Sequence, residues 1–178
     1  MTPDTQAPNK PLRVLIVEDS EDDTILLVRE LRRGGYDATF ERVQTAQAMK
    51  KALEKQTWDI VISDFVLPKF SGYAALDALK AAGLDLPFII VSGNIGEDVA
   101  VEAMKAGAHD YIMKDRLKRL VPAVERELGD ARVRRDQRMA QDNLNRATDL
   151  LEKIFSLAHI MIAYMDRDFN FVRVNPAF

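Results

Sequence analysis

Five short apolar runs, separated by segments with helical periodicity, are the feature that most limits what this chain can fold into. They are LRVLIV (12–17), DATFERV (37–43), WDIVIS (58–63), LPFIIVS (86–92) and HDYIMK (109–114). Four are almost continuously apolar, as parallel strands covered on both faces are, and the second alternates like an edge strand. Gly34, Gly83 and Gly107 stand where the intervening helices should end. The pattern predicts an α/β fold, a doubly wound five-stranded parallel sheet.

Composition excludes several classes of protein. The 178 residues carry a formal net charge of −3, which gives no general attraction for nucleic acid, and the absence of cysteine excludes disulfides and thiolate metal sites. No apolar run approaches the length that spans a bilayer, and residues 1–11 contain no apolar core of a signal peptide. We therefore expect a cytoplasmic protein with a disordered start at residues 1–11 and no partner among nucleic acids or membranes.

A change of pattern after Lys114 indicates a C-terminal extension. One apolar stripe consists of Leu117, Val121, Val124 and Leu128, and a second of Leu144, Ala147, Leu151, Ile154 and Ala158. The stripes differ in register, so a mainly helical segment over residues 116–156 is predicted to bend, unwind or change its packing partner between residues 129 and 143, most easily at Gly129. The last residues read as a short β-hairpin. The expected divisions are a first domain at 12–128, a helical linker at 129–158 and a further segment at 159–178.

Polar side chains follow four of the five predicted strands. Glu18 and Asp19 come after the first strand, Asp64 ends the third, Ser92 ends the fourth and Lys114 ends the fifth. In an open α/β sheet, ligands bind beyond the carboxyl ends of the strands, so we expect these side chains to meet at one edge. Each residue alone would be an ordinary strand-end polar group, but their joint placement indicates a site.

The residue types at this edge suit phosphoryl transfer. Three neighbouring carboxylates repel one another unless a cation neutralises them, and hard oxygen ligands suit Mg²⁺. A carboxylate can attack phosphorus to form an aspartyl phosphate, while the metal and a lysine absorb charge on the phosphoryl oxygens. The sequence contains neither G-x-G-x-x-G nor G-x-x-x-x-G-K-[ST], which disfavours a flavin- or nucleotide-binding domain of the same architecture.

Other polar residues near the site have simpler explanations. Ser20 and Asp23 form the pattern of a helix capping box, and Glu21 and Asp22 suit a helix N-terminus, so these four residues are left out of the predicted site. The two histidines, at positions 109 and 159, lie in no phosphotransfer or metal pattern and receive no role.

Four motifs in order along the chain resemble the response-regulator receiver domain, which has a flavodoxin-like fold. They are VEDS (17–20), SDFVLPKFSG (63–72), VSGN (91–94) and AGAHDYIMK (106–114). The resemblance implies that Asp64 accepts the phosphoryl group and that Asp19 and Asp64 bind Mg²⁺ directly. It further implies that Glu18 is an outer or water-mediated ligand and that the Val66 carbonyl is another ligand. Ser92 and Lys114 would hold phosphoryl oxygens, and Ser92 and Tyr111 would form the switch that moves inward on activation.

The sequence departs from the family pattern after Lys114. The family usually has proline with a cis peptide bond there, whereas this chain has Asp115. A cis bond without proline costs about 3 kcal/mol, so the Lys114–Asp115 bond is predicted to be trans, with Asp115 capping a helix that begins near Arg116. Glu18 replaces the commoner aspartate, and its extra methylene leaves the coordination geometry open.

From about Leu144, and most clearly in IAYMDRDFNFVRVNPAF (162–178), the chain resembles the beginning of a PAS sensory domain. The leading interpretation is a phosphorelay receiver that takes phosphate from a histidine kinase or phosphotransfer protein, forms a homodimer through its C-terminal helix and switches a downstream module. It would be a switch and not an enzyme acting on other substrates, although a longer parent protein could carry a kinase or cyclic-nucleotide enzyme. The alternative is a degenerate receiver that serves as a phosphorylation-independent interaction domain, favoured if the Asp115 loop misplaces Lys114.

Overall fold

The computed structural model describes residues 10–68, 70–93, 97–158 and 162–176. They divide into two compact units, Met1–Ala131 and Arg132–Phe178. Among the described helices, none combines the length and the apolar composition that a membrane span requires. Of the residues predicted to be disordered, 1–11, the first nine lie outside the described residues, and the prediction is wrong for Lys10 and Pro11, which belong to a strand.

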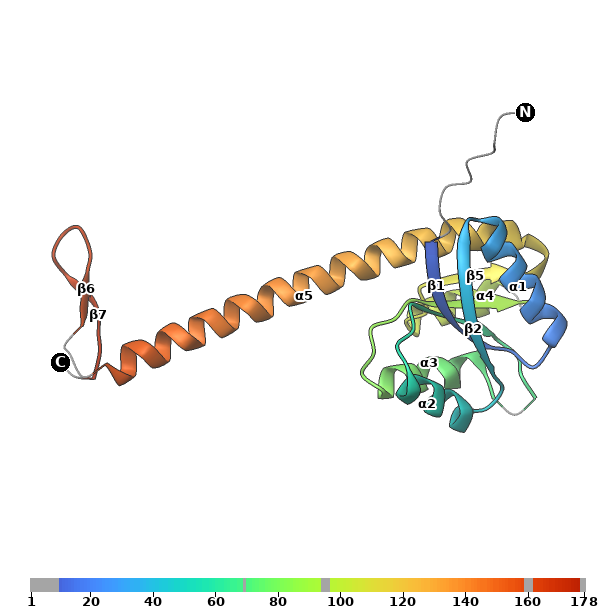
Figure 1. Ribbon diagram of the computed structural model, residues 1–178, viewed down its shortest axis with the longest axis horizontal. Coiled ribbons are helices and arrows are strands. Elements are labelled where there is room, and N and C mark those ends of the chain that lie inside the picture. The colour runs from blue at the N-terminus through green and yellow to red at the C-terminus, as the bar shows by residue number, and fades with distance from the viewer. Residues whose placement is uncertain (1–9, 69, 94–96, 159–161, 177–178) are drawn as a thin grey trace, which may run out of the picture. The chain divides into compact units, whose positions relative to one another are not determined.

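The first unit contains a parallel sheet with strand order β2-β1-β3-β4-β5 (Figure 1). Its strands are β1 (Lys10–Val17), β2 (Tyr36–Val43), β3 (Ile60–Asp64), β4 (Phe88–Ser92) and β5 (Asp110–Met113). The predicted doubly wound fold is confirmed, and β2, whose first four residues alternate between buried and exposed, lies at an edge as expected. β1 begins two residues before the predicted domain start at Leu12, because the Lys10 N–H donates to the Gly35 carbonyl at 2.9 Å.

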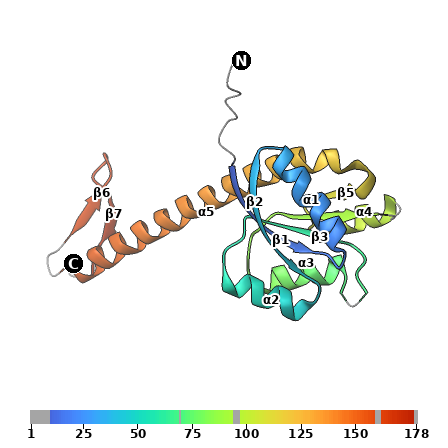
Figure 2. The ribbon, with the colours of Figure 1, turned by 45° about the vertical axis from the view of Figure 1, so that its right-hand side comes forward.

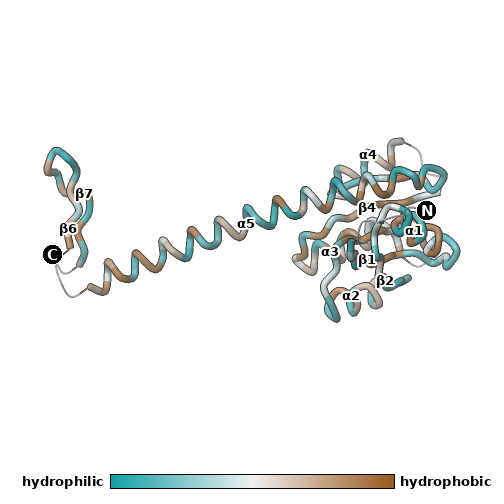
Figure 3. The backbone as a smooth tube through the Cα atoms, turned by 45° about the horizontal axis from the view of Figure 1, so that its top comes forward, coloured by the Kyte–Doolittle hydropathy of each residue, from teal (hydrophilic) through white to brown (hydrophobic). Residues whose placement is uncertain are grey.

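Helices cover both faces of the sheet, as Figure 2 shows. They are α1 (Glu21–Arg33), α2 (Ala46–Lys55), α3 (Gly72–Ala81), α4 (Glu97–Lys105) and α5 (Leu120–Leu157), with a short 3₁₀ helix, η1 (Lys114–Arg119), before α5. Side chains of α1 and α5 pack with one set of strand residues, and those of α2, α3 and α4 pack with the alternate set. The central strands β3 and β4 are therefore buried along nearly their whole length, and brown, apolar backbone lies around the label of β4 in Figure 3.

Glycines terminate three helices in the predicted places. Gly34 caps α1, and Gly83 and Gly107, which follow α3 and α4, have φ of 68° and 98°. After α1 the left-handed conformation falls one residue later, at Gly35 with φ of 84°. Position 34 requires glycine for a different reason. A Cβ there would lie 2.5 Å from a methyl group of Val121, because the end of α1 packs tightly against α5.

The long C-terminal helix corrects part of the sequence prediction. The segment is helical as expected, and of the three alternatives predicted near Gly129, local unwinding is wrong, because α5 continues for 38 residues from Leu120 to Leu157 without an interruption. The packing environment does change: Ala131 is buried, whereas Val133, Leu144 and Leu151 are exposed. A helix needs no break at a glycine that lies on an exposed face, because the cost of about 1 kcal/mol is spread over a long cooperative element.

In the second unit, a β-hairpin follows the helix. Strands β6 (Ala163–Met165) and β7 (Phe171–Val174) are antiparallel. Asn175 links the hairpin to the end of the helix. Its side-chain oxygen accepts from the Ile162 N–H at 2.9 Å, and its side-chain NH₂ group donates to the Ala158 carbonyl at 3.2 Å. Arg173 pairs with Glu152 of the helix and lies 4.6 Å from the centre of the Phe155 ring. The predicted hairpin is confirmed.

Candidate functional site

The carboxyl ends of β1, β3 and β5 bring the predicted acidic residues and lysine together. One carboxylate oxygen from each of Glu18, Asp19 and Asp64 lies within 4.8 Å of the others. Glu18 and Asp19 stand between the end of β1 and Ser20, which caps α1 with its hydroxyl, so a short turn directs them to this edge. The three residues predicted from scattered motifs form one acidic cluster.

Glu18 is the most buried member of this cluster, with 1% of its surface exposed. One of its oxygens, Oε1, accepts from the Ser20 N–H at 3.0 Å, and the other, Oε2, accepts from Lys114 Nζ at 2.9 Å. Burial raises the pKa of the Glu18 carboxyl; the hydrogen bonds from Ser20 and Lys114 partly oppose this, and the charge of Asp64 adds to it. The longer side chain therefore reaches inward to the lysine and is held there by the turn that precedes α1.

Lys114 lies at the centre of the site. Its Nζ donates to Asp64 Oδ2 at 2.8 Å, to Glu18 Oε2 at 2.9 Å and to Asp23 Oδ2 at 2.6 Å. Partial burial tends to lower the pKa of this ammonium group, but the hydrogen bonds to Asp23, Asp64 and Glu18 outweigh it and raise the pKa above its ordinary value. Lys114 is therefore held as a cation beside the predicted phosphoacceptor.

Asp23 is the member of the site that sequence reasoning missed. Only half of the predicted capping box forms: the Asp23 N–H donates to Ser20 Oγ at 3.2 Å, but the Ser20 N–H donates to Glu18, and the Asp23 carboxylate accepts from Lys114 instead. The place of Asp23 in the sequence could have indicated its role. The first turn of α1 follows β1 directly and therefore lies over the edge where the strands end. A residue one turn after Asp19 is within reach of that edge.

The loop after Asp64 is tightly held. Val66 N–H donates to Asp64 Oδ1 at 3.3 Å, and Gly72 N–H donates to the Phe65 carbonyl at 3.0 Å. A Cβ on Gly72 would lie 3.1 Å from the Asp64 carbonyl oxygen, so the start of α3 requires a small residue there. The side chain of Val66 is exposed, and the role of its carbonyl as a metal ligand stays a prediction.

The two predicted switch residues lie on the neighbouring strands. Ser92 ends β4 and is buried, and Gly93 after it is exposed. Tyr111 in β5 is partly buried against the cluster formed with α2, α3 and α4, and its hydroxyl lies 3.3 Å from the sulfur of Met113. Asn94, the last residue of the third motif, is outside the described residues.

The backbone after Lys114 confirms one prediction and corrects another. The Lys114–Asp115 peptide bond is trans, as are the other described peptide bonds. Asp115 does not cap the following helix, because the helical turn already begins at Lys114, and Met113 in the capping position supplies no side-chain hydrogen bond. Asp115 lies instead inside the first turn, where a negative charge is favourable near the helix N-terminus.

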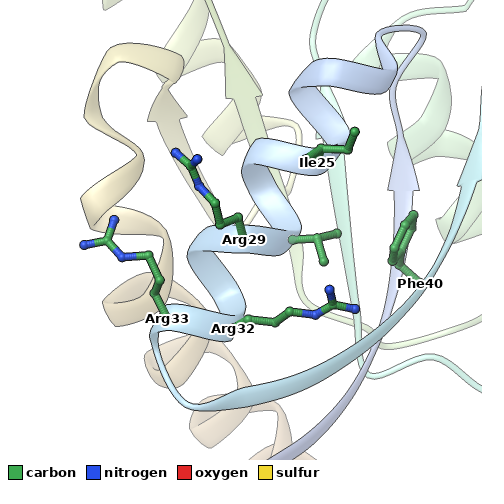
Figure 4. A pocket seen from close by; sticks show the side chains of 6 residues that line it. Ile25, Arg29, Arg32, Arg33 and Phe40 are labelled. Carbon is green, nitrogen blue, oxygen red and sulfur yellow. The ribbon is translucent and has the colours of Figure 1, made fainter.

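A separate recess lies between α1 and the edge strand β2 (Figure 4). It has a volume of about 570 Å³ and is lined by Ile25, Val28, Arg29, Arg32, Arg33 and Phe40. These side chains offer positive charge and apolar surface but no nucleophile or carboxylate. The chemistry therefore belongs to the edge that carries Asp64.

The chain is similar to known proteins over the part that contains this site. The family described as the response regulator receiver domain matches residues 14–125, which is more than half of the chain. Transcriptional regulatory protein RprY of Bacteroides fragilis is 32% identical over 106 residues, 60% of this chain and 44% of RprY. Transcriptional regulatory protein PrrA of Mycobacterium tuberculosis is 33% identical over 102 residues, 57% of this chain and 43% of PrrA. The matched part thus spans less than half the length of these relatives.

A solved structure gives the same result for the fold. The signal receiver domain of a Vibrio parahaemolyticus protein described as a LuxO repressor is similar with a TM-score of 0.62 and 29% identity. The similarity covers 70% of this chain and 95% of that domain. It therefore includes nearly all of the compared domain and leaves part of this chain unmatched.

Proposed function

Because the chain belongs to the family of response-regulator receiver domains, we propose that it is a phosphorelay switch that takes a phosphoryl group on Asp64. The observation that carries the proposal is the 2.8 Å contact between Lys114 Nζ and Asp64 Oδ2, beside the carboxylates of Glu18 and Asp19. A nucleophilic carboxylate, a cation next to it and a cluster of oxygen ligands are the parts that phosphoryl transfer to an aspartate needs.

The proposed reaction is a transfer from a phosphohistidine of a histidine kinase or phosphotransfer protein. An Asp64 oxygen attacks phosphorus and forms a P–O bond, while the P–N bond of the donor breaks and its electron pair stays on the imidazole nitrogen. An ionised carboxylate has no proton to lose, so the step requires no general base. Lys114 is placed to stabilise negative charge on the phosphoryl oxygens, with the Ser92 hydroxyl as the second proposed contact.

The acidic cluster fits Mg²⁺. Its donors are carboxylate oxygens from Glu18, Asp19 and Asp64 within 4.8 Å of one another, and this cation prefers oxygen ligands. We propose that Asp19 and Asp64 bind it directly, that Glu18 acts as an outer ligand and that the Val66 carbonyl completes the protein ligands. When bound, the ion supplies positive charge that offsets repulsion among the carboxylates and an incoming phosphoryl group.

The position of Lys114 also supports this proposal over the degenerate-receiver alternative. That alternative would be favoured if the Asp115 loop carried Lys114 away from Asp64. The trans peptide bond and the 3₁₀ turn at Lys114 instead leave its ammonium group within hydrogen-bond distance of the acceptor. The missing proline is therefore compatible with a working site.

For the output we propose that α5 joins two copies of the chain and carries the signal outward. Leu144, Leu151 and Ile154 recur at coiled-coil spacing and are each more than half exposed. Inward movement of Ser92 and Tyr111 on phosphorylation would alter the surface beside β5, and η1 and α5 follow that strand directly. The PAS-like interpretation of residues 159–178 is part of the same proposal, and the exposed apolar side chains of the described hairpin, such as Phe171 and Val172, favour further packing there.

Incubation with Mg²⁺ and acetyl phosphate, followed by intact mass measurement, tests the proposed function. We expect the protein to gain one hydroxylamine-labile phosphoryl group and the Asp64→Asn variant to gain none. Asp77→Asn, at an exposed position on α3, makes the same chemical change away from the site and should label normally. Wild-type labelling in Asp64→Asn, or no labelling of the wild type, would contradict the proposal.

A further inference from the structure

Asp23 makes the shortest of the three contacts to the site lysine. Its Oδ2 lies 2.6 Å from Lys114 Nζ, compared with 2.8 Å for Asp64 and 2.9 Å for Glu18. An ammonium group has three N–H donors. All three are therefore engaged by carboxylates before any phosphoryl group is present.

Phosphorylation at Asp64 introduces further anionic oxygens that need the same cation. Lys114 can serve them only by releasing or weakening one of its existing hydrogen bonds. The carboxylate that loses its hydrogen bond from Lys114 must then be hydrated, because an unpaired charge in a protein interior is energetically costly. The exposure of the three carboxylates therefore indicates which one is replaced.

The three side chains differ clearly in their access to water. The exposed fraction is 1% for Glu18, 11% for Asp64 and 33% for Asp23. Asp23 and Lys114 also line a small cleft of about 30 Å³, together with Leu26 and Leu117. This volume is enough for a water molecule. Of the three carboxylates, Asp23 loses its lysine contact at the lowest cost.

We infer that Asp23 is a positioning residue that holds Lys114 in the unphosphorylated state and releases it to the phosphoryl group, thereby restraining phosphorylation of Asp64. The inference rests on the proposed function and assigns to α1 a regulation of that site. Two physical effects act in the same direction. The Asp23 carboxylate competes for Lys114, and its negative charge repels an anionic phosphodonor.

The structural role of Asp23 can be separated from this one. Its contribution to the start of α1 is a backbone N–H that donates to Ser20 Oγ, and Asn or Ala at position 23 retains that N–H. Glu21 and Asp22 still supply negative charge to the first turn of α1. Ala at position 23 therefore removes the contact with Lys114, and Asn removes the negative charge, while both leave the helix start intact.

The test measures the rate of phosphorylation by acetyl phosphate at fixed Mg²⁺, with the melting temperature recorded for each variant. Asp23→Asn and Asp23→Ala should be phosphorylated about tenfold faster than the wild type, which corresponds to about 1.4 kcal/mol at 25 °C. Asp23→Glu, which keeps the charge, should return the rate toward the wild-type value. Asp22→Asn is the matched control, because it removes an exposed negative charge from the same turn of α1, and its rate should stay within about twofold of the wild type.

The outcomes separate this inference from the proposed function. A wild type that labels, with Asp23→Asn and Asp23→Ala as slow as the wild type or slower, would overturn the inference alone. An equal acceleration in Asp22→Asn would also overturn it, since the effect would then be one of general charge. A wild type that takes no phosphoryl group would overturn the proposed function and this inference together.

Discussion

The acidic residues at the carboxyl edge of the sheet share a chemistry but differ in their surroundings. Glu18 is buried and engaged by both Ser20 and Lys114, whereas Asp19 is exposed and its carbonyl accepts from Arg42 at 3.0 Å. Asp64 lies between them in exposure and ends β3. A cation that arrives from solvent can therefore bind the Asp19 carboxylate with less disruption of existing hydrogen bonds than at Glu18 or Asp64.

We predict that Asp19→Ala weakens Mg²⁺ binding at least about tenfold. Loss of a residue that only hydrogen-bonds to a metal ligand already lowers metal affinity by about this factor, and loss of the ligand itself should lower it at least as much. Isothermal titration gives the affinity directly. Since a ligand of the native state stabilises it by mass action, Mg²⁺ should also raise the melting temperature of the wild type and have little effect on the variant. Asp22→Ala serves as the control, and an Asp19→Ala affinity equal to that of the wild type would refute the site.

At the scale of elements, the packing of α1 against α5 depends on one residue without a side chain. Gly34 has φ of −79°, which any residue adopts, so its requirement for glycine comes from the neighbouring Val121 and not from the backbone. Val121 and Leu117 lie at the start of the segment that leads from the site to the long helix. This contact holds the first turn of α5 against the end of α1.

Two glycine substitutions should therefore have opposite effects on stability. Gly34→Ala should lower the free energy of unfolding by about 1 to 3 kcal/mol, the usual cost of overpacking, because the new methyl group overlaps Val121. Gly129→Ala should raise it by up to about 1 kcal/mol, since that glycine is exposed inside α5 and nothing packs within 4 Å of the place that an alanine methyl group would take. Urea denaturation of both variants checks the pair, and a Gly34→Ala protein as stable as the wild type would show that α1 and α5 are loosely packed.

At the scale of the whole molecule, the exposed stripe of α5 determines the expected oligomeric state. Leu144, Leu151 and Ile154 are 61%, 67% and 57% exposed, which is unusual for residues repeating on one helix face. Asp149 lies on the opposite side of the same helix and carries a charge, so the two faces differ in polarity.

We predict that the chain is a dimer at tens of micromolar, a concentration at which an interface of about 8 kcal/mol is largely formed. Sedimentation velocity should show a dimer for the whole chain and a monomer for a chain that ends at Leu128. Leu151→Lys should give a monomer, because it places a charge in the stripe, whereas Asp149→Lys on the outer face should remain dimeric. A monomeric whole chain at this concentration would disprove the dimer.

The sequence alone determined the doubly wound architecture and the identity of the acidic cluster. Apolar runs and helical periodicity are local properties, and parallel strands necessarily deliver their last residues to one edge. Glu18, Asp19, Asp64 and Lys114 could therefore be placed together without coordinates. The trans bond before Asp115 followed in the same way, from the intrinsic cost of a cis peptide without proline.

Only the tertiary structure decided how the remaining residues take part. Asp23 and Lys114 are 91 positions apart, and the capping pattern around Asp23 offered a sufficient local explanation that concealed the contact. The start of the helical turn at Lys114 was mispredicted from local signals, and at Gly129 those signals could not choose between unwinding and a change of packing environment in a continuous helix. For Asp23 the deciding interaction joins segments distant in sequence, whereas α5 continues through Gly129 because a long cooperative helix tolerates the small local cost of one exposed glycine.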